Sequence, residues 1–421
     1  MNNIAFACFI LAILHTFSVK LFQHLAHKYP EGSVQENFFH LLGEVEVVFG
    51  IWALILMSLF AIMMGRHESI VYLEKLNFTE PLFVFVIMVV SATKPLIKFA
   101  DKLIHFFSKL LPINKTIAFY ISTLVIGPLL GSFITEPAAM TVTALILSNY
   151  FYKHKISMDL KYATLGLLFV NVSIGGAMTP YAAPPILMVA GTWGWDLAYV
   201  FSHFGIESII STLISTIGVA IYFRKELSHF NLKKEKENEM KIPWWVTLTH
   251  LIFLALVVMN AHHSVIFISL FMFFIGFTTV TKEYQTELKI KEGLLVSFFL
   301  GGLVVLGSFQ SFWLTPLLQK LNSIALYLGS IGLTAITDNA ALTYLGSQVP
   351  GLSDEMKLAL VSGAIIGGGL TVIANAPNPA GYGILNPSFG EEGISPWGLF
   401  KAASIPTIVA ATIFYLSRTI I

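Results

Sequence analysis

The sequence contains two similar stretches in its two halves, Ile134-Thr-Glu-Pro-Ala-Ala139 and Ile336-Thr-Asp-Asn-Ala-Ala341. Each stretch places one carboxylate inside an otherwise apolar segment. A second pair follows in the same order, Ile174-Gly-Gly-Ala-Met-Thr179 and Ile366-Gly-Gly-Gly-Leu-Thr371, and Pro-rich residues come after each member. Two ordered pairs of motifs indicate that the chain contains an internal repeat.

The composition is typical of a membrane protein. Of 421 residues, 56% are hydrophobic and only 12% are charged, whereas soluble domains average about 25% charged residues. The mean hydropathy is +0.76. A membrane-spanning helix needs ~20 mainly apolar residues. Long runs without Lys, Arg, Asp or Glu meet this requirement at residues 47–65, 162–195, 242–281 and 293–319, and at 116–135.

Several classes of partner and chemistry are not expected. The formal net charge is +1 and there is no basic tail, so nucleic acid is not an expected partner. The single cysteine, Cys8, excludes an intrachain disulfide and a Cys-based metal site. No catalytic or cofactor-binding motif is present, so we expect neither an enzyme nor a cofactor. Residues 1–14 are apolar without a preceding basic region, which favours a retained first helix over a cleaved signal.

Lys and Arg predict the orientation. They cluster at residues 98–115, 153–161, 224–241 and 282–291, and cytoplasmic loops carry the excess of basic residues. The segment between Lys115 and Lys153 has both ends in the cytoplasm and is too long for one helix across a ~30 Å core. It therefore predicts a re-entrant hairpin with its tip near Glu136, and two short full spans are the alternative.

The same logic predicts an all-α polytopic membrane protein with two inverted repeats. Each repeat has about five spans, a re-entrant hairpin and a broken helix. The first covers residues 1–223, a cytoplasmic linker covers 224–242, and the second covers 243–421. Because each repeat crosses the membrane an odd number of times, the second copy is inverted. The termini are expected on the periplasmic side of a bacterial inner membrane. Inverted repeats with broken helices are typical of secondary transporters.

The two motif carboxylates, Glu136 and Asp338, are the expected ion ligands. A charge at the bilayer centre costs roughly 2.5–3.5 kcal/mol, and burial favours the neutral form of a carboxylate. One such group can therefore bind a cation or a proton in turn. Neutral oxygens suit a small hard cation such as sodium. They are expected from Thr135, Thr337, Asn339, Asn375, Asn378, Thr179 and Thr371.

The alternative interpretation is that both acids cap helices or pair with a buried cation. This alternative is stronger for Glu136 than for Asp338, because Thr135-Glu136-Pro137 also has the pattern of a helix start. Asp338 is therefore the preferred ion ligand. Lys94, Glu207 and Glu46 are further candidates as charge partners, although Lys94 could equally extend its amine to the interface. The bound cation would be a transported ion, and no structural metal is expected.

The quoted motifs, with Gly367-Gly-Gly-Leu-Thr-Val-Ile-Ala-Asn-Ala-Pro-Asn378, resemble the ion transporter superfamily over nearly the whole chain. That group includes NhaD-type sodium/proton antiporters, arsenite permeases and divalent anion/sodium symporters. The chain is most similar to a bacterial family of sodium/proton antiporters. The resemblance implies an elevator-like transport domain and a scaffold domain that often dimerises. Small inorganic ions, the lipid bilayer and a second copy of the chain are thus the implied partners.

One departure from the superfamily bears on the substrate. The anion/sodium symporters carry Ser-Asn-Thr at both hairpin tips, whereas this chain carries Thr135-Glu136-Pro137 and Thr337-Asp338-Asn339. An added negative charge at each tip would repel a dicarboxylate. The sequence thus favours sodium/proton antiport by alternating access. The alternative is a sodium-coupled transporter of dicarboxylate, sulfate or arsenite-type anions.

Overall fold

The computed structural model describes residues 1–154, 156–229, 241–390 and 393–420, and side chains as far as residue 417. Within these ranges all regular elements are helical and none is a strand. The middle of the predicted linker, with Lys233, Lys234 and Lys236, lies outside the described residues.

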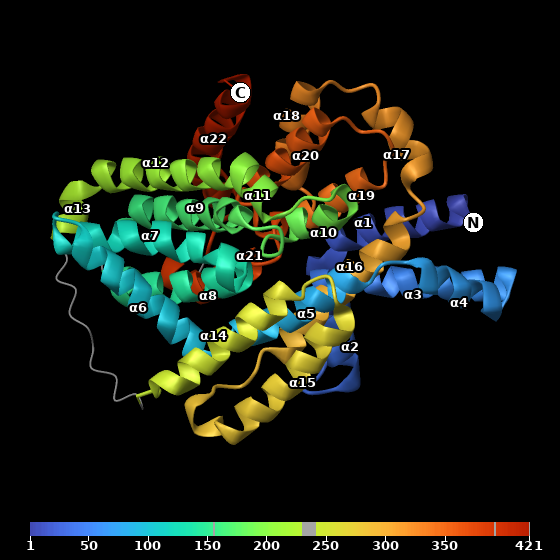
Figure 1. Ribbon diagram of the computed structural model, residues 1–421, viewed down its shortest axis with the longest axis horizontal. Coiled ribbons are helices and arrows are strands. Elements are labelled where there is room, and N and C mark those ends of the chain that lie inside the picture. Colours follow the sequence, from blue (N-terminus) through green and yellow to red (C-terminus); the bar gives the residue numbers. More distant parts are fainter. Residues whose placement is uncertain (155, 230–240, 391–392, 421) are drawn as a thin grey trace.

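The described helices of the first half begin at α1 and end at α13. Figure 1 shows them in blue to green. They are α1 (Asn2–Ala26), α2 (Val34–Leu42), α3 (Val45–Met64), α4 (Arg66–Lys75), α5 (Thr79–Ser91), α6 (Lys94–Leu110), α7 (Lys115–Ile134), α8 (Glu136–Leu147), α9 (Met158–Gly175), α10 (Pro184–Trp193), α11 (Leu197–Val200), α12 (Ile206–Tyr222) and α13 (Arg224–Ser228).

The described helices of the second half are fewer, and the short helix α17 comes before the second motif. They are α14 (Trp244–Met259), α15 (Ser264–Val280), α16 (Ile290–Gly307), α17 (Ser311–Leu318), α18 (Ser323–Thr334), α19 (Asn339–Ser347), α20 (Asp354–Gly367), α21 (Asn378–Leu385) and α22 (Pro396–Ile420).

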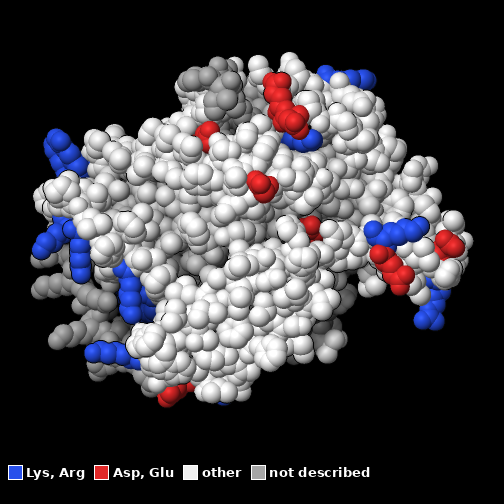
Figure 2. All heavy atoms as spheres, in the orientation of Figure 1, with Lys and Arg blue, Asp and Glu red and all other residues white. Residues whose placement is uncertain are grey.

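The helices identify an integral membrane protein. Seven described helices are long and apolar enough to cross a membrane, or eight spans result if the bent pair α5 and α6 counts as one. The apolar helices α14, α15 and α18 are shorter. Figure 2 shows Lys and Arg gathered toward the ends of the visible face, with mostly uncharged surface between them. The predicted all-α polytopic class is confirmed, and the inverted relation of the halves stays a prediction.

The third span differs from the sequence prediction. The chain bends by 70° between α5 and α6, and Lys94 is the first residue of α6 rather than a residue near the end of one straight helix. Pro95 occupies the first turn of α6, where its missing amide hydrogen costs nothing. Leu96, Ala100 and Ile104 are buried at four-residue spacing. The basic residues expected in a loop therefore lie on an amphipathic helix.

The first motif forms the tip of a tight hairpin. A Cβ atom on Gly127 would lie 2.3 Å from the hydroxyl oxygen of Thr143, and one on Gly131 would lie 3.3 Å from Ala139, so α7 and α8 pack antiparallel at close range. Thr135 makes the turn with φ of 74°, the only positive φ at a non-glycine residue in the described ranges. Its hydroxyl lies 3.1 Å from that of Ser91 in α5, which holds this strained turn.

The broken helices bring the two halves of the chain together. α10 packs against α19, and α21 packs against α8, so each hairpin contacts the short half-helix of the other half. These segments lie in the middle of Figure 1. The helices that lead into the two breaks, α9 and α20, also meet closely. A Cβ atom on Gly369, just after α20, would lie 2.4 Å from the Cα of Val170 in α9. Glycine thus permits backbone contact at the centre of the molecule.

A second close crossing joins α3 and α16. A Cβ atom on Gly302 would lie 2.4 Å from the backbone nitrogen of Gly50 and from the carbonyl carbon of Phe49. These are backbone atoms, which cannot rotate away. The neighbouring Gly301 is different, because its Cβ would meet only the ring of Phe78 at 3.8 Å, an ordinary contact.

We predict that Gly302→Ala separates α3 from α16 and destabilises the protein by about 1–3 kcal/mol, the usual cost of overpacking. Thermal unfolding of the detergent-purified protein should show a lower midpoint. Gly301→Ala is the matched control and should leave the midpoint unchanged. Equal midpoints for the two variants would contradict this packing.

Candidate ion-binding site

Glu136 is fully buried at the start of α8. Its Oε2 accepts a hydrogen bond of 2.7 Å from the Asn375 side chain, which belongs to the broken helix of the other half. Its Oε1 has no hydrogen-bond partner among the described residues. The side chain therefore reaches across the interface and does not cap α8, which answers the question that the sequence left open for this residue.

A glycine makes the space beside Glu136. Gly176 begins the short 3-10 turn Gly176–Met178 that follows α9. A Cβ atom there would lie 2.5 Å from both Cγ and Oε1 of Glu136. The hydroxyl of Ser132 in α7 holds this turn, since it donates to the Gly175 carbonyl at 2.7 Å and accepts from the Met178 amide at 2.9 Å. The free carboxylate oxygen thus faces backbone at a break in the helix.

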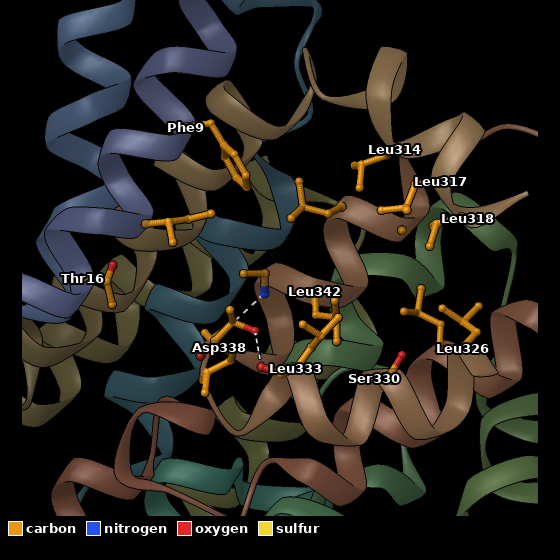
Figure 3. A pocket seen from close by; sticks show the side chains of 18 of the residues that line it. Phe9, Thr16, Leu314, Leu317, Leu318, Leu326, Ser330, Leu333, Asp338 and Leu342 are labelled. Carbon is orange, nitrogen blue, oxygen red and sulfur yellow. Dashed lines mark hydrogen bonds between the residues drawn. The ribbon is translucent and has the colours of Figure 1, made fainter. Parts of the chain in front are cut away.

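Asp338 has a different environment. Its Oδ1 accepts hydrogen bonds from the amides of Ala340 and Ala341, at 2.8 and 3.1 Å, and so caps α19. Asp338 therefore caps α19, whereas Glu136 makes no capping hydrogen bond to α8. The preference for Asp338 as the ion ligand stays a prediction. The side chain is half-buried and lines a large cavity, in which Figure 3 shows it among leucines.

Three asparagines supply carboxamide oxygens close to the breaks. Asn339, Asn375 and Asn378 are all buried, and the side-chain oxygen of each has no hydrogen-bond partner among the described residues. The amide of Asn378 is held by the carbonyls of Gly368 and Thr371, at 2.7 and 2.8 Å. Their donors are thus partly used for structure while their acceptors remain available, which is the arrangement that a hard cation requires.

Gly368 brings the two halves together at this point. A Cβ atom on it would lie 2.2 Å from the hydroxyl oxygen of Ser173 in α9 and 2.8 Å from the side-chain nitrogen of Asn339. Gly368 thus faces the first residue of α19, as Gly176 faces the first residue of α8. Sequence reasoning missed Ser173 and the contacts that the two glycines make with Glu136 and Asn339, although both glycines lie in the repeated motifs.

The four threonines mainly position the backbone. The hydroxyl of Thr179 donates to the Ser132 carbonyl, and that of Thr371 donates to the Ala335 carbonyl, both at 2.8 Å. Each bond ties a broken helix to the hairpin of its own half. Thr337 donates to the preceding turn of α18 at 2.9 Å, and Thr135 contacts α5 as described. The donors of Thr179, Thr371 and Thr337 are committed to these carbonyls, whereas in the bond between Thr135 and Ser91 either hydroxyl can be the donor.

The carboxylates at the centre lack basic partners. These carboxylates are those of Glu136 and Asp338, at the starts of α8 and α19, and that of Glu46, in the first turn of α3. In the described part of the chain, no Lys or Arg nitrogen lies within 4.0 Å of a carboxylate oxygen of these residues. Lys94 thus forms no ion pair with Glu136.

The remaining charge candidate is Glu207. It is buried in the first turn of α12, and its Oε2 has no hydrogen-bond partner among the described residues. The structure shows no bond between Glu207 and the motif carboxylates in the ranges it describes. The same ranges contain no group of three or more His, Cys, Asp or Glu side chains that could hold a metal ion.

Comparison with known proteins identifies the family. The family model described as "Putative Na+/H+ antiporter" matches residues 1–417. The chain belongs to this family. The suspected relation to sodium/proton antiporters is thereby confirmed, and the protein is a transporter integral to the membrane. A search among curated proteins found no match. In a family of antiporters, the buried Oε1 of Glu136 is the atom that bears most directly on ion binding, because it has no hydrogen-bond partner among the described residues.

We predict that Gly176→Ala impairs the antiporter without unfolding it, because the new methyl group displaces the carboxylate of Glu136. Sodium-driven proton movement in everted vesicles should fall by about tenfold or more, and the purified protein should still elute as a single peak. Gly218→Ala in α12 is the control, since its Cβ would meet no atom within 4 Å. Full activity in Gly176→Ala would contradict the placement of Glu136.

Proposed function

We propose that the protein exchanges sodium for protons by alternating access and that Glu136 is the group at which the two ions compete. One observation carries the proposal: Glu136 is fully buried, with one oxygen held by Asn375 and the other without a partner in the described residues. An isolated buried carboxylate cannot remain charged without a large free-energy cost. It needs a proton or a cation.

The surroundings of Glu136 favour sodium as that cation. A proton on Oε1 neutralises the carboxylate, and so does a monovalent cation beside it, but the two occupy the same place. Carboxamide oxygens of Asn375, Asn339 and Asn378 are the neutral hard ligands that suit sodium. Asp338, on the cavity side, would attract the cation through its negative charge. Binding of one ion thus requires release of the other, which is the coupling that an antiporter needs.

The packing of the two halves supports alternating access. Each hairpin contacts the short half-helix of the opposite half, as expected for inverted repeats that meet at a shared site. The proposal includes the predicted orientation, in which both termini lie in the periplasm of a bacterial inner membrane and the linker lies in the cytoplasm. It also includes a homodimer that forms through the scaffold domain.

The helix starts near the site argue against the alternative, sodium-coupled anion transport. A helix N-terminus binds anions through free backbone amides. Proline, which has no amide hydrogen, occupies the first turn of α8, α10 and α21. The fourth start, that of α19, already has the carboxylate of Asp338 on its amides. These starts therefore offer few donors to a dicarboxylate or sulfate.

We predict that Glu136→Gln abolishes sodium-driven collapse of a pH gradient in everted vesicles, because glutamine can neither release a proton nor neutralise a cation. Asp338→Asn should retain a reduced rate, since asparagine can still cap α19. Glu68→Gln, at an exposed position of α4, is the control. Unchanged exchange in both Glu136→Gln and Asp338→Asn would refute the proposed site.

Competition at one carboxylate also predicts a pH dependence. Protons occupy Glu136 more often as the pH falls, so the apparent KM for sodium should rise toward acidic pH, by up to about tenfold per pH unit where protonation dominates. The maximal rate at saturating sodium should change less. Initial rates at several sodium concentrations and pH values measure this. A KM independent of pH across the active range would exclude competition between the two ions.

A further inference from the structure

One cavity of the described structure has a single charged residue in its lining. Its volume is about 390 Å³, within the range of small-molecule sites. It lies between α1, α3, α17, α18 and α19, as Figure 3 shows. Its lining is almost entirely Leu, Ile, Phe, Trp, Val, Ala and Gly, and the only charged side chain in it is Asp338.

The polar groups of the lining are few. The hydroxyls of Thr16 and Thr337 donate to carbonyls of the preceding turns of their own helices, whereas the buried hydroxyl of Ser330 has no hydrogen-bond partner among the described residues. Asp338 uses Oδ1 to cap α19, while no described residue donates to its Oδ2. A ligand in this cavity therefore meets apolar surface on most sides, the hydroxyl of Ser330 and one carboxylate oxygen that can accept a hydrogen bond.

The electrostatics of the cavity select the sign of the ligand. No Lys, Arg or His lines it. A cation is attracted by the negative charge of Asp338, whereas an anion is repelled and a neutral molecule gains only the apolar contacts and the hydroxyl of Ser330. A charged hydrogen bond to a carboxylate is also about twice as strong as a neutral one.

The cavity has an open edge. The lining residues Phe17, Leu333 and Ile336 are each about half exposed, at 55%, 49% and 51%. They belong to apolar helices of the membrane protein or to the turn beside them, so the opening lies in an apolar part of the surface. A molecule that partitions into the bilayer can reach the cavity from there. The expected ligand therefore has an apolar body and a positive charge.

We propose that this cavity binds lipophilic ammonium ions, with the apolar body among the leucines and the ammonium group on Oδ2 of Asp338. Such a ligand would occupy the cavity side of the ion site and compete with the cation that Asp338 attracts. The binding step itself does not rest on the proposed sodium/proton exchange. It can therefore be measured on purified protein whether or not exchange is observed.

Calorimetric titration of the full-length protein in a neutral detergent tests the proposal. The probe is phenylbutylammonium, and phenylbutanol is the uncharged control that enters micelles as well. Wild-type protein should bind the ammonium ion at least about tenfold more tightly than the alcohol. Asp338→Asn should lose this preference and keep the weak binding of the alcohol. Equal affinity of wild-type protein for both probes would overturn the proposal and leave an apolar site suited to acyl chains.

A second pair of variants keeps the test valid if Asp338→Asn misfolds. Gly329 in α18 lines the cavity, and a Cβ atom on it would meet nothing within 4 Å, so Gly329→Leu fills the cavity. Gly332, one turn further along α18, has equal room but does not line the cavity. Gly329→Leu should reduce binding of the ammonium ion by about tenfold or more, and Gly332→Leu should not. Unreduced binding in Gly329→Leu would place the probe elsewhere.

Discussion

The side chain of Asn375 donates to Oε2 of Glu136 across 2.7 Å, and this hydrogen bond joins residues that are 239 positions apart in the sequence. It fixes a carboxylate of the first half against the broken helix of the second, inside a protein whose composition offers few charges. The second oxygen of Glu136 remains without a partner in the described chain. Because a buried negative charge must be neutralised, we propose that the rest of the site controls which ion does so.

The hydrogen bond between Asn375 and Glu136 is possible because backbone segments of the two halves approach each other closely. Gly176, Gly368 and Gly369 allow the breaks to meet, since a side chain at any of them would collide with Glu136, Asn339 or α9. Around them, α10 on α19 and α21 on α8 connect each hairpin to the opposite half. The hairpins and broken helices of both halves therefore form one packed unit around Glu136.

The breaks themselves could be predicted from the sequence, because Pro137, Gly175 and Gly176 act on the backbone locally. The α-helical membrane class followed from composition in the same way. The partner of Glu136 could not be predicted, since it depends on how the two halves pack. The different surroundings of the two acids have a geometric reason: Asp338 precedes its helix and caps it, whereas Glu136 is the first residue of its helix and points across the interface. Helix α6 could not be predicted either, because its Lys residues suggested a cytoplasmic loop.

The central claim is that sodium and a proton exclude each other at Glu136. Proton release on sodium binding measures this most directly. Sodium is added to purified wild-type protein in a weakly buffered solution, at a pH at which exchange occurs, and a pH-sensitive dye follows the protons. The account predicts release of protons that saturates with sodium and is absent in Glu136→Gln. Saturable sodium binding by the wild-type protein without any proton release would contradict it.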